Sequence, residues 1–181
     1  DGHSVTVVDS MWFGNHLDDA LDAEVIQEDV RNIDALPVAG MDTIIHLANV
    51  ANDPGVELDE TLSWEVNALA TQRLADRAVR AGVEEFLFAS SGSVYGGKDE
   101  REVTAELELV PISAYNKTKM VAERILVSYA GDMQIHNIRP ATVCGVSPRM
   151  RFDVSVNMFA KQGFIDGRMT VFGGRQVRPN I

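Results

Sequence analysis

The chain has 181 residues, of which 45% are hydrophobic and 24% are charged, as expected for one well-buried globular domain. A formal net charge of −11 argues against a nucleic-acid or anionic-membrane surface, since both need clustered lysines and arginines. The single cysteine, Cys144, excludes an internal disulfide and predicts a reducing, cytoplasmic location. The histidines are too dispersed to form a metal motif, and no apolar run approaches the ~20 residues that span a bilayer.

Short β-branched runs alternate with helical patterns along the chain, which is typical of a parallel α/β sheet. We expect strands over residues 4–9, 24–27, 42–48, 85–90 and 134–139, and a further short strand over 169–172. Helical spacing of apolar residues predicts a helix over 61–81 that stops at Gly82, and another over 154–164. A third helix is expected from the N-cap Ser113 to about Ala130, where Gly131 would end it.

Tyr115 and Lys119 stand four residues apart on the first turns of the third predicted helix, so their side chains share one face. A positive charge ~4 Å from a phenol, at an effective dielectric constant of ~20, is worth roughly 4 kcal/mol, or about three pKa units. The resulting phenolate would be a suitable general base for an alcohol. Taken alone, the pair is also compatible with a chance pairing on a surface helix.

A strand that runs into a Ser/Gly-rich turn, Phe88-Ala-Ser-Ser-Gly-Ser-Val-Tyr-Gly96, precedes Tyr115 by some two dozen residues. The two motifs together resemble those of the extended short-chain dehydrogenase/reductase family of NAD-dependent nucleotide-sugar epimerases and dehydratases. In that family the strand ends in Ser-Ser-x-x-Val-Tyr-Gly, and the hydroxyl three residues before the Val contacts the reacting sugar oxygen. The resemblance therefore implies a catalytic centre of Ser91, Tyr115 and Lys119, in a Rossmann-like doubly wound parallel sheet.

Several other stretches are similar to the cofactor-binding segments of the family. Asp9 ends a strand where the family has an acid that accepts hydrogen bonds from the adenosine ribose, which favours NAD over NADP. His46 itself is interpreted as a buried core histidine, and Asn67 is equally compatible with helix packing. The resemblance implies the following cofactor-binding residues: Asp9, Asp29, Val30, Leu47, Ala48, Asn67, Ser90, Tyr115, Lys119 and Val143. It implies that Ser91, Ser93, Asn157, Phe172 and Arg178 bind the substrate.

The family's opening strand and glycine-rich pyrophosphate turn have no counterpart in this sequence. We therefore expect a fragment that lacks the first βα unit and most of the C-terminal substrate lobe. Residues 1–145 would belong to an incomplete NAD-binding domain, and residues 146–181 would begin the nucleotide-sugar-binding region.

The positions where the family's dehydratases and decarboxylases carry acids are Gly92 and Ser93 here. The remaining Ser-Tyr-Lys set favours an epimerase, acting at C4 through a transient keto-sugar formed by hydride transfer to NAD. A dehydratase, decarboxylase or 4-dehydrogenase of the same family remains an alternative, as does a non-catalytic dinucleotide-binding protein. The family also implies a homodimer through the helices over 61–81 and 113–130, with apolar positions at Leu69, Ala70, Leu74, Val121, Ile125 and Leu126.

Overall fold

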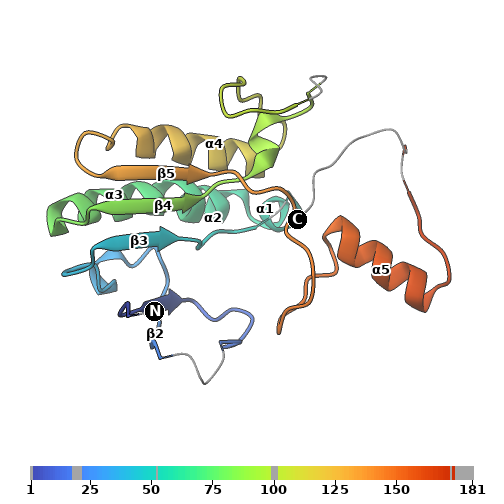
Figure 1. The fold of residues 1–181 in the computed structure, drawn as a ribbon, viewed down its shortest axis with the longest axis horizontal. Helices are drawn as coiled ribbons and strands as arrows, with labels where there is room; N and C mark the ends of the chain where they lie inside the picture. Colours follow the sequence, from blue (N-terminus) through green and yellow to red (C-terminus); the bar gives the residue numbers. More distant parts are fainter. Residues whose placement is uncertain (1, 18–21, 52, 99–101, 172, 174–181) are drawn as a thin grey trace. The chain divides into compact units, whose positions relative to one another are not determined.

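The computed structural model describes residues 2–17, 22–51, 53–98, 102–171 and 173 (Figure 1). The chain divides into two units, Asp1–Arg139 and Pro140–Ile181, and each is described by itself below. Within the described ranges, no helix combines the length and the apolar character that crossing a membrane requires.

The strands of the first unit are all paired in parallel, which confirms the predicted sheet class. The strands β1 (Thr6–Asp9) and β2 (Glu24–Gln27) form one sheet. A second sheet has the order β3-β4-β5, formed by Thr43–His46, Glu85–Ala89 and Gln134–Ile138. No described strand pairs with the outer edge of β1 or β3, and Ile45 on β3 is 64% exposed. These two strand edges are therefore unpaired among the described residues.

The long helix predicted over 61–81 is present as three consecutive segments. These are α2 (Glu60–Trp64), a π-helical turn η2 (Glu65–Leu69) and α3 (Ala70–Ala81). Asp59 caps its start by accepting a hydrogen bond from the Leu62 amide. The helix stops at Gly82, as predicted, and this glycine has the left-handed conformation. The sequence pattern did not predict the π-helical turn, the preceding short helix α1 (Asp53–Leu58) or the 3-10 turn η1 (Ile33–Ala35).

Two predictions about the later elements need correction. The helix α4 (Ala114–Val127) begins after the N-cap Ser113 as predicted but ends three residues before Ala130. The following amides, from Ser128 to Ala130, bond three residues back instead of four, which tightens the chain out of the α-helix. The helix α5 (Ser155–Ile165) confirms the last predicted helix, but residues 169–171 form no strand, because no described strand pairs with them.

The main core lies between β4 and the helices α3 and α4, which Figure 1 shows running alongside the sheet. Phe86 and Phe88 alternate along β4 and are fully buried, together with Ala75 and Ala78 of α3 and Leu126 of α4. Each large side chain of this kind contributes about 1.5–3 kcal/mol when it leaves water. The core therefore fixes α4 against the carboxyl end of β4.

A 3-10 turn, η3 (Gly92–Tyr95), continues from β4 and ends at Gly96, which has a positive φ of 70°. A Cβ at Gly96 would collide with the carbonyl oxygen of Val110, whereas one at the neighbouring Gly97 would meet nothing within 4 Å.

We expect Gly96→Ala to lower the free energy of unfolding by about 2 kcal/mol or more, since it adds a clash to backbone strain. Gly97→Ala, the matched control, should change it by less than about 0.5 kcal/mol. Equal denaturation midpoints for the two variants would contradict this account.

Candidate active site

The Ser/Gly-rich turn at the end of β4 is tied to the first turn of α4 by side-chain hydrogen bonds. Ser91 Oγ accepts a hydrogen bond from the Ser93 amide at 3.2 Å and lies 2.7 Å from Ser93 Oγ. Ser93 Oγ in turn donates to Asn116 Oδ1 at 2.6 Å. Asn116 directly follows Tyr115, so this relay brings the turn that carries Ser91 to the part of α4 that carries Tyr115.

Lys119 makes a second tie between the same two elements. Its side chain is 1% exposed, and its Nζ donates to the carbonyl oxygen of Ala89 at 2.8 Å and lies 4.7 Å from the centre of the Phe88 ring. Burial lowers the pKa of Lys119 from 10.5 to about 7, although the nearby Glu123 carboxylate acts to raise it. The buried lysine therefore changes its protonation state near pH 7. Its hydrogen-bond partner, Ala89, lies two residues before Ser91 in the sequence.

Tyr115 lies in the first turn of α4, one helical turn before Lys119, as predicted. Its ring packs, partly buried, against a small apolar cluster of Val50, Val56 and Val66. The Ser113 hydroxyl caps this turn by accepting from the Asn116 amide at 3.2 Å. The structure thus brings the elements that carry Ser91, Tyr115 and Lys119 together at the carboxyl end of β4.

Six of the residues expected to hold the cofactor lie at the ends of four parallel strands of the first unit. They are Asp9, the last residue of β1, then Asp29 and Val30 after β2, Leu47 and Ala48 after β3, and Ser90 after β4. Ligands of open parallel α/β sheets bind outside the carboxyl ends of the strands. This placement agrees with the prediction, although no contact with a cofactor follows from it.

The loop after β3 combines an exposed side chain with a buried polar one. Leu47 is 63% exposed, and its carbonyl oxygen accepts a hydrogen bond from Asn49 Nδ2 at 2.8 Å. The buried Asn49 Oδ1 has no hydrogen-bond partner among the described residues, which leaves an acceptor unused. His46, by contrast, is a satisfied core residue as expected, since its Nε2 lies 2.9 Å from Thr71 Oγ1.

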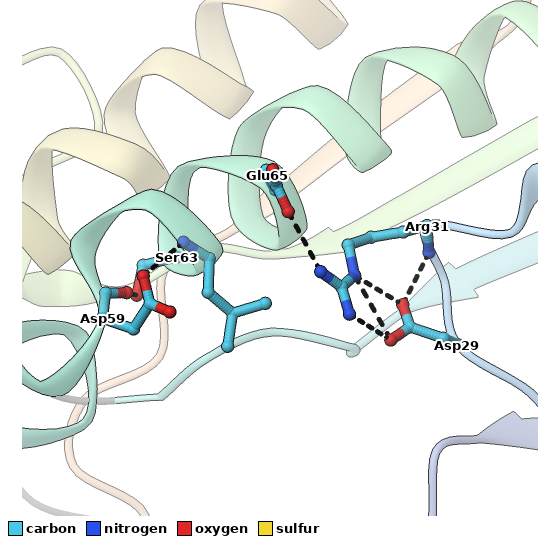
Figure 2. Close-up of polar contacts among 6 residues, drawn as sticks. Asp29, Arg31, Asp59, Ser63 and Glu65 are labelled. Carbon is cyan, nitrogen blue, oxygen red and sulfur yellow. Dashed lines mark hydrogen bonds and ion pairs between the residues drawn. The ribbon is translucent and has the colours of Figure 1, made fainter.

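The carboxylate of Asp29 is held by Arg31, as Figure 2 shows. The Arg31 guanidinium bonds both oxygens of Asp29 at 2.9–3.2 Å and reaches Glu65 Oε2 at 3.0 Å. This arginine lowers the pKa of the Asp29 carboxyl below its usual value, so Asp29 is a stable anion. A hollow of about 470 Å³ lies beside it, lined by Asp29, Arg31, Asn32, Glu65, Leu69, Ala70 and Arg73.

The amide of Asn67 is occupied by the protein itself. Its Oδ1 accepts from the Val50 amide at 2.8 Å, and its Nδ2 donates to the Val50 carbonyl and to Thr118 Oγ1, both at 3.1 Å. Asn67 lies on the π-helical turn η2 and joins the loop after β3 to α4. The geometry therefore favours the packing interpretation of Asn67, and a direct cofactor contact stays a prediction.

The remaining predicted residues belong to the second unit. Asn157 Oδ1 accepts from the Gly145 amide at 3.0 Å, and its Nδ2 donates to the Arg151 carbonyl at 2.9 Å, so this amide organises the loop before α5. Val143 is 63% exposed. Phe172 and Arg178 lie outside the described residues. The binding roles of these four residues stay predictions.

The sequence interpretation missed two residues of the site, Asn116 and Glu123. With Lys119 they stand at helical spacing on the face of α4 that also buries Ala122 and Leu126. Polar side chains at these apolar positions were the available signal, because buried polar groups need partners and therefore mark a network.

The lowered pKa of Lys119 predicts a specific pH dependence of stability. Between about pH 7 and pH 10.5 the unfolded chain keeps a proton on Lys119 that the folded chain has lost. The free energy of unfolding should therefore rise with pH over this interval, by up to about 1.4 kcal/mol per pH unit from this group. Lys119→Met should lose this increment in denaturation at several pH values, whereas the exposed Lys117→Met should keep it. Parallel pH profiles for wild type and Lys119→Met would contradict the assignment.

Known proteins with similar sequences belong to the family that the motifs indicate. The family model described as "NAD dependent epimerase/dehydratase family" matches residues 1–180. The uncharacterized UDP-glucose epimerase YtcB of Bacillus subtilis is 33% identical, over 84% of this chain and 49% of its own length. A 3 beta-hydroxysteroid dehydrogenase/Delta 5-->4-isomerase of Mycobacterium tuberculosis is 30% identical, over 84% of this chain and 43% of its own.

A solved structure supports the fold and the cofactor of the family. MoeE5, solved with UDP-glucuronic acid and NAD, is 30% identical with a TM-score of 0.74, over 89% of this chain and 53% of that one. The chain thus spans about half the length of these relatives. The Rossmann-like fold class and NAD as the family's cofactor are confirmed, and the chain belongs to the NAD-dependent epimerase/dehydratase family.

Proposed function

We propose that the protein containing this chain is a nucleotide-sugar epimerase that acts at C4 and uses NAD. The observation that carries the proposal is that hydrogen bonds tie the end of β4 and the turn that carries Ser91 to the part of α4 that carries Tyr115 and Lys119. It is supported by the absence of an acid at Gly92 and Ser93, the positions from which related lyases would be expected to act.

In the proposed reaction, Tyr115 takes the proton from the sugar hydroxyl, and Ser91 donates a hydrogen bond to the same oxygen. Lys119 in its cationic form favours the tyrosinate and so makes Tyr115 a competent base near neutral pH. NAD, when bound, would supply the acceptor for the hydride of the sugar carbon and the donor for its return. Asp9, Asp29, Val30, Leu47, Ala48, Ser90 and Val143 would hold the cofactor, and Ser93, Asn157, Phe172 and Arg178 would contact the nucleotide-sugar.

The alternatives to this proposal differ in the products that they would give. A dehydratase would release water, a decarboxylase would release CO₂, and a 4-dehydrogenase would release the keto-sugar with reduced cofactor. A non-catalytic dinucleotide-binding protein would give no product, and a steroid substrate is suggested by the mycobacterial relative. Incubation of the complete protein with UDP-, GDP-, CDP- and dTDP-sugars and a 3β-hydroxysteroid, followed by product NMR, separates these cases. The proposal expects an epimeric nucleotide-sugar.

Tyr115→Phe tests the catalytic assignment, because it removes the proton acceptor and keeps the ring. In the complete protein, kcat should fall by a factor on the order of 10² to 10⁴, with nucleotide-sugar affinity nearly unchanged. Ser91→Ala should cost less, since one hydrogen bond is lost and no proton acceptor. Lys119→Met should reduce kcat and also weaken NAD binding.

The matched control is Tyr129→Phe, since the Tyr129 hydroxyl donates to Asp76 on α3, a contact outside the catalytic set. Its kcat should match that of the wild type. Retention of most of the activity by Tyr115→Phe would show that the catalytic assignment is wrong.

We also propose a homodimer, with one correction to the predicted surface. Ala70, Leu74 and Leu126 are buried in the core and are not available to a partner. Leu69, Val121 and Ile125 do line a shallow groove between η2 and α4, together with Trp64 and Ala68. A largely apolar groove of this kind on the two predicted helices suits a second copy of the chain.

A cytoplasmic location likewise stays a prediction from the cysteine content.

Leu69→Asp should convert the dimer into a monomer, because a carboxylate would be buried without a partner at the centre of the interface. The control is Leu58→Asp on α1, at a position that is 89% exposed and outside the groove. Light scattering at micromolar concentration should give a dimer for the control and for the wild type. A monomeric wild type would contradict the proposal.

A further inference from the structure

Glu123 is a buried carboxylate that the proposed reaction does not use. It lies on α4 one helical turn after Lys119, and only 3% of its surface is exposed. A carboxylate at this depth is costly unless partners compensate its charge, so the identity of those partners indicates what the residue does.

Three elements meet at the Glu123 carboxylate. Ser90 Oγ, directly before Ser91, donates a hydrogen bond to Glu123 Oε1. Arg139, directly after β5, forms a forked pair with both oxygens, with Nε at 3.0 and 3.2 Å and one terminal nitrogen at 2.6 Å. The other terminal nitrogen of Arg139 donates to Tyr95 Oη at 2.7 Å, on the turn that follows Ser91. The carboxylate thus connects α4 to both sides of the Ser91 turn.

Stability alone gives a weak reason for this arrangement. A buried ion pair is often no more stabilising than well-packed apolar side chains of the same volume, although breaking one partner costs about 3–5 kcal/mol. A pair of apolar residues would therefore serve the fold equally well. Such a pair could neither accept the Ser90 hydroxyl nor place a negative charge beside Lys119.

The negative charge of Glu123 affects the protonation of Lys119, because the other surroundings of the lysine offer little charge. From β4 the lysine meets only a carbonyl oxygen and the Phe88 ring, among the described residues. From β3 it faces His46, which is uncharged because burial lowers its pKa to about 3. On α4, Tyr115 lies one turn before it and Glu123 one turn after it. Burial favours the neutral amine, and Glu123 is the charge that acts against this effect and raises the pKa of Lys119.

We propose that Glu123 is a positioning residue for the reaction: it holds the Ser90–Ser91 turn against α4 and keeps Lys119 protonated for its action on Tyr115. The electrostatic half concerns the chain alone, and the consequence for turnover rests on the proposed function. Glu123 itself contacts neither reacting atoms nor substrate in this account. Its effect passes through Ser90 and Lys119.

The direct test is the ionisation of Lys119 in the complete protein without substrate, followed by NMR of ¹³C-labelled lysine side chains over a pH series. Lys119→Met identifies the signal. Glu123→Gln should move the Lys119 midpoint to lower pH by about one unit or more, the range expected for loss of a nearby opposite charge. Glu84→Gln, which removes an exposed carboxylate, should leave the midpoint unchanged. An unchanged midpoint in Glu123→Gln would overturn the electrostatic half.

Kinetics with the nucleotide-sugar that the protein turns over separates the effect of Glu123 on the charge of Lys119 from its hold on the Ser90–Ser91 turn. In Glu123→Gln the alkaline limb of the kcat profile should move to lower pH together with the Lys119 midpoint. Ser90→Ala removes the tie to the turn and keeps the charge, so kcat should fall several-fold with the alkaline limb in place. If Ser90→Ala leaves kcat at the wild-type value, the positioning half is wrong.

If Glu123→Gln does not fold, the double variant Glu123→Gln/Arg139→Gln replaces it, because it leaves no unpaired guanidinium in the core. The double variant should shift the Lys119 midpoint in the same direction. If the wild type turns over no sugar, the proposed function fails. The Lys119 titration still decides the role of Glu123 in that case.

Discussion

The buried ammonium group of Lys119 is the constraint on which the first unit depends. With 1% exposure it has lost its hydration, and its Nζ donates a hydrogen bond to the last carbonyl of β4. This bond fixes the rotation of α4 about its axis and therefore the direction in which the helix presents Tyr115. The core of Phe86, Phe88 and Leu126 sets the distance between the strand and the helix, and the lysine sets their register.

One face of α4 thus both packs in the core and bonds the end of β4. Asn116, Lys119 and Glu123 occupy positions that an ordinary packed helix would give to apolar residues, and each of them bonds the end of β4 or the turn beyond it. The cost of burying these polar groups is offset by their mutual satisfaction across the two elements. These bonds restrain α4 against the end of β4, and the proposed reaction needs a base at a fixed place.

The sequence predicted the element order and the parallel pairing well, because apolar periodicity is a local signal. The position of the site stays a prediction from the two motifs. Gly82 and Ser113 marked helix ends through their own backbone and side-chain preferences. The π-helical turn at Asn67 and the role of Glu123 depend on contacts between residues distant in the sequence, such as Asn67 with Val50 and Glu123 with Arg139. Residues 169–171 of the strand expected at 169–172 form no strand, since pairing needs a neighbour that a local pattern does not supply.

The central claim is that the Ser91, Tyr115 and Lys119 site removes hydrogen from a sugar carbinol. It is tested most directly with a nucleotide-sugar deuterated at C4, in a single turnover by the complete protein loaded with NAD. The account predicts that the deuterium is found on the cofactor when the reaction is quenched early, and that turnover is slower than with the undeuterated sugar. Product formed with no deuterium ever reaching the cofactor, or with exchange into solvent instead, would contradict it.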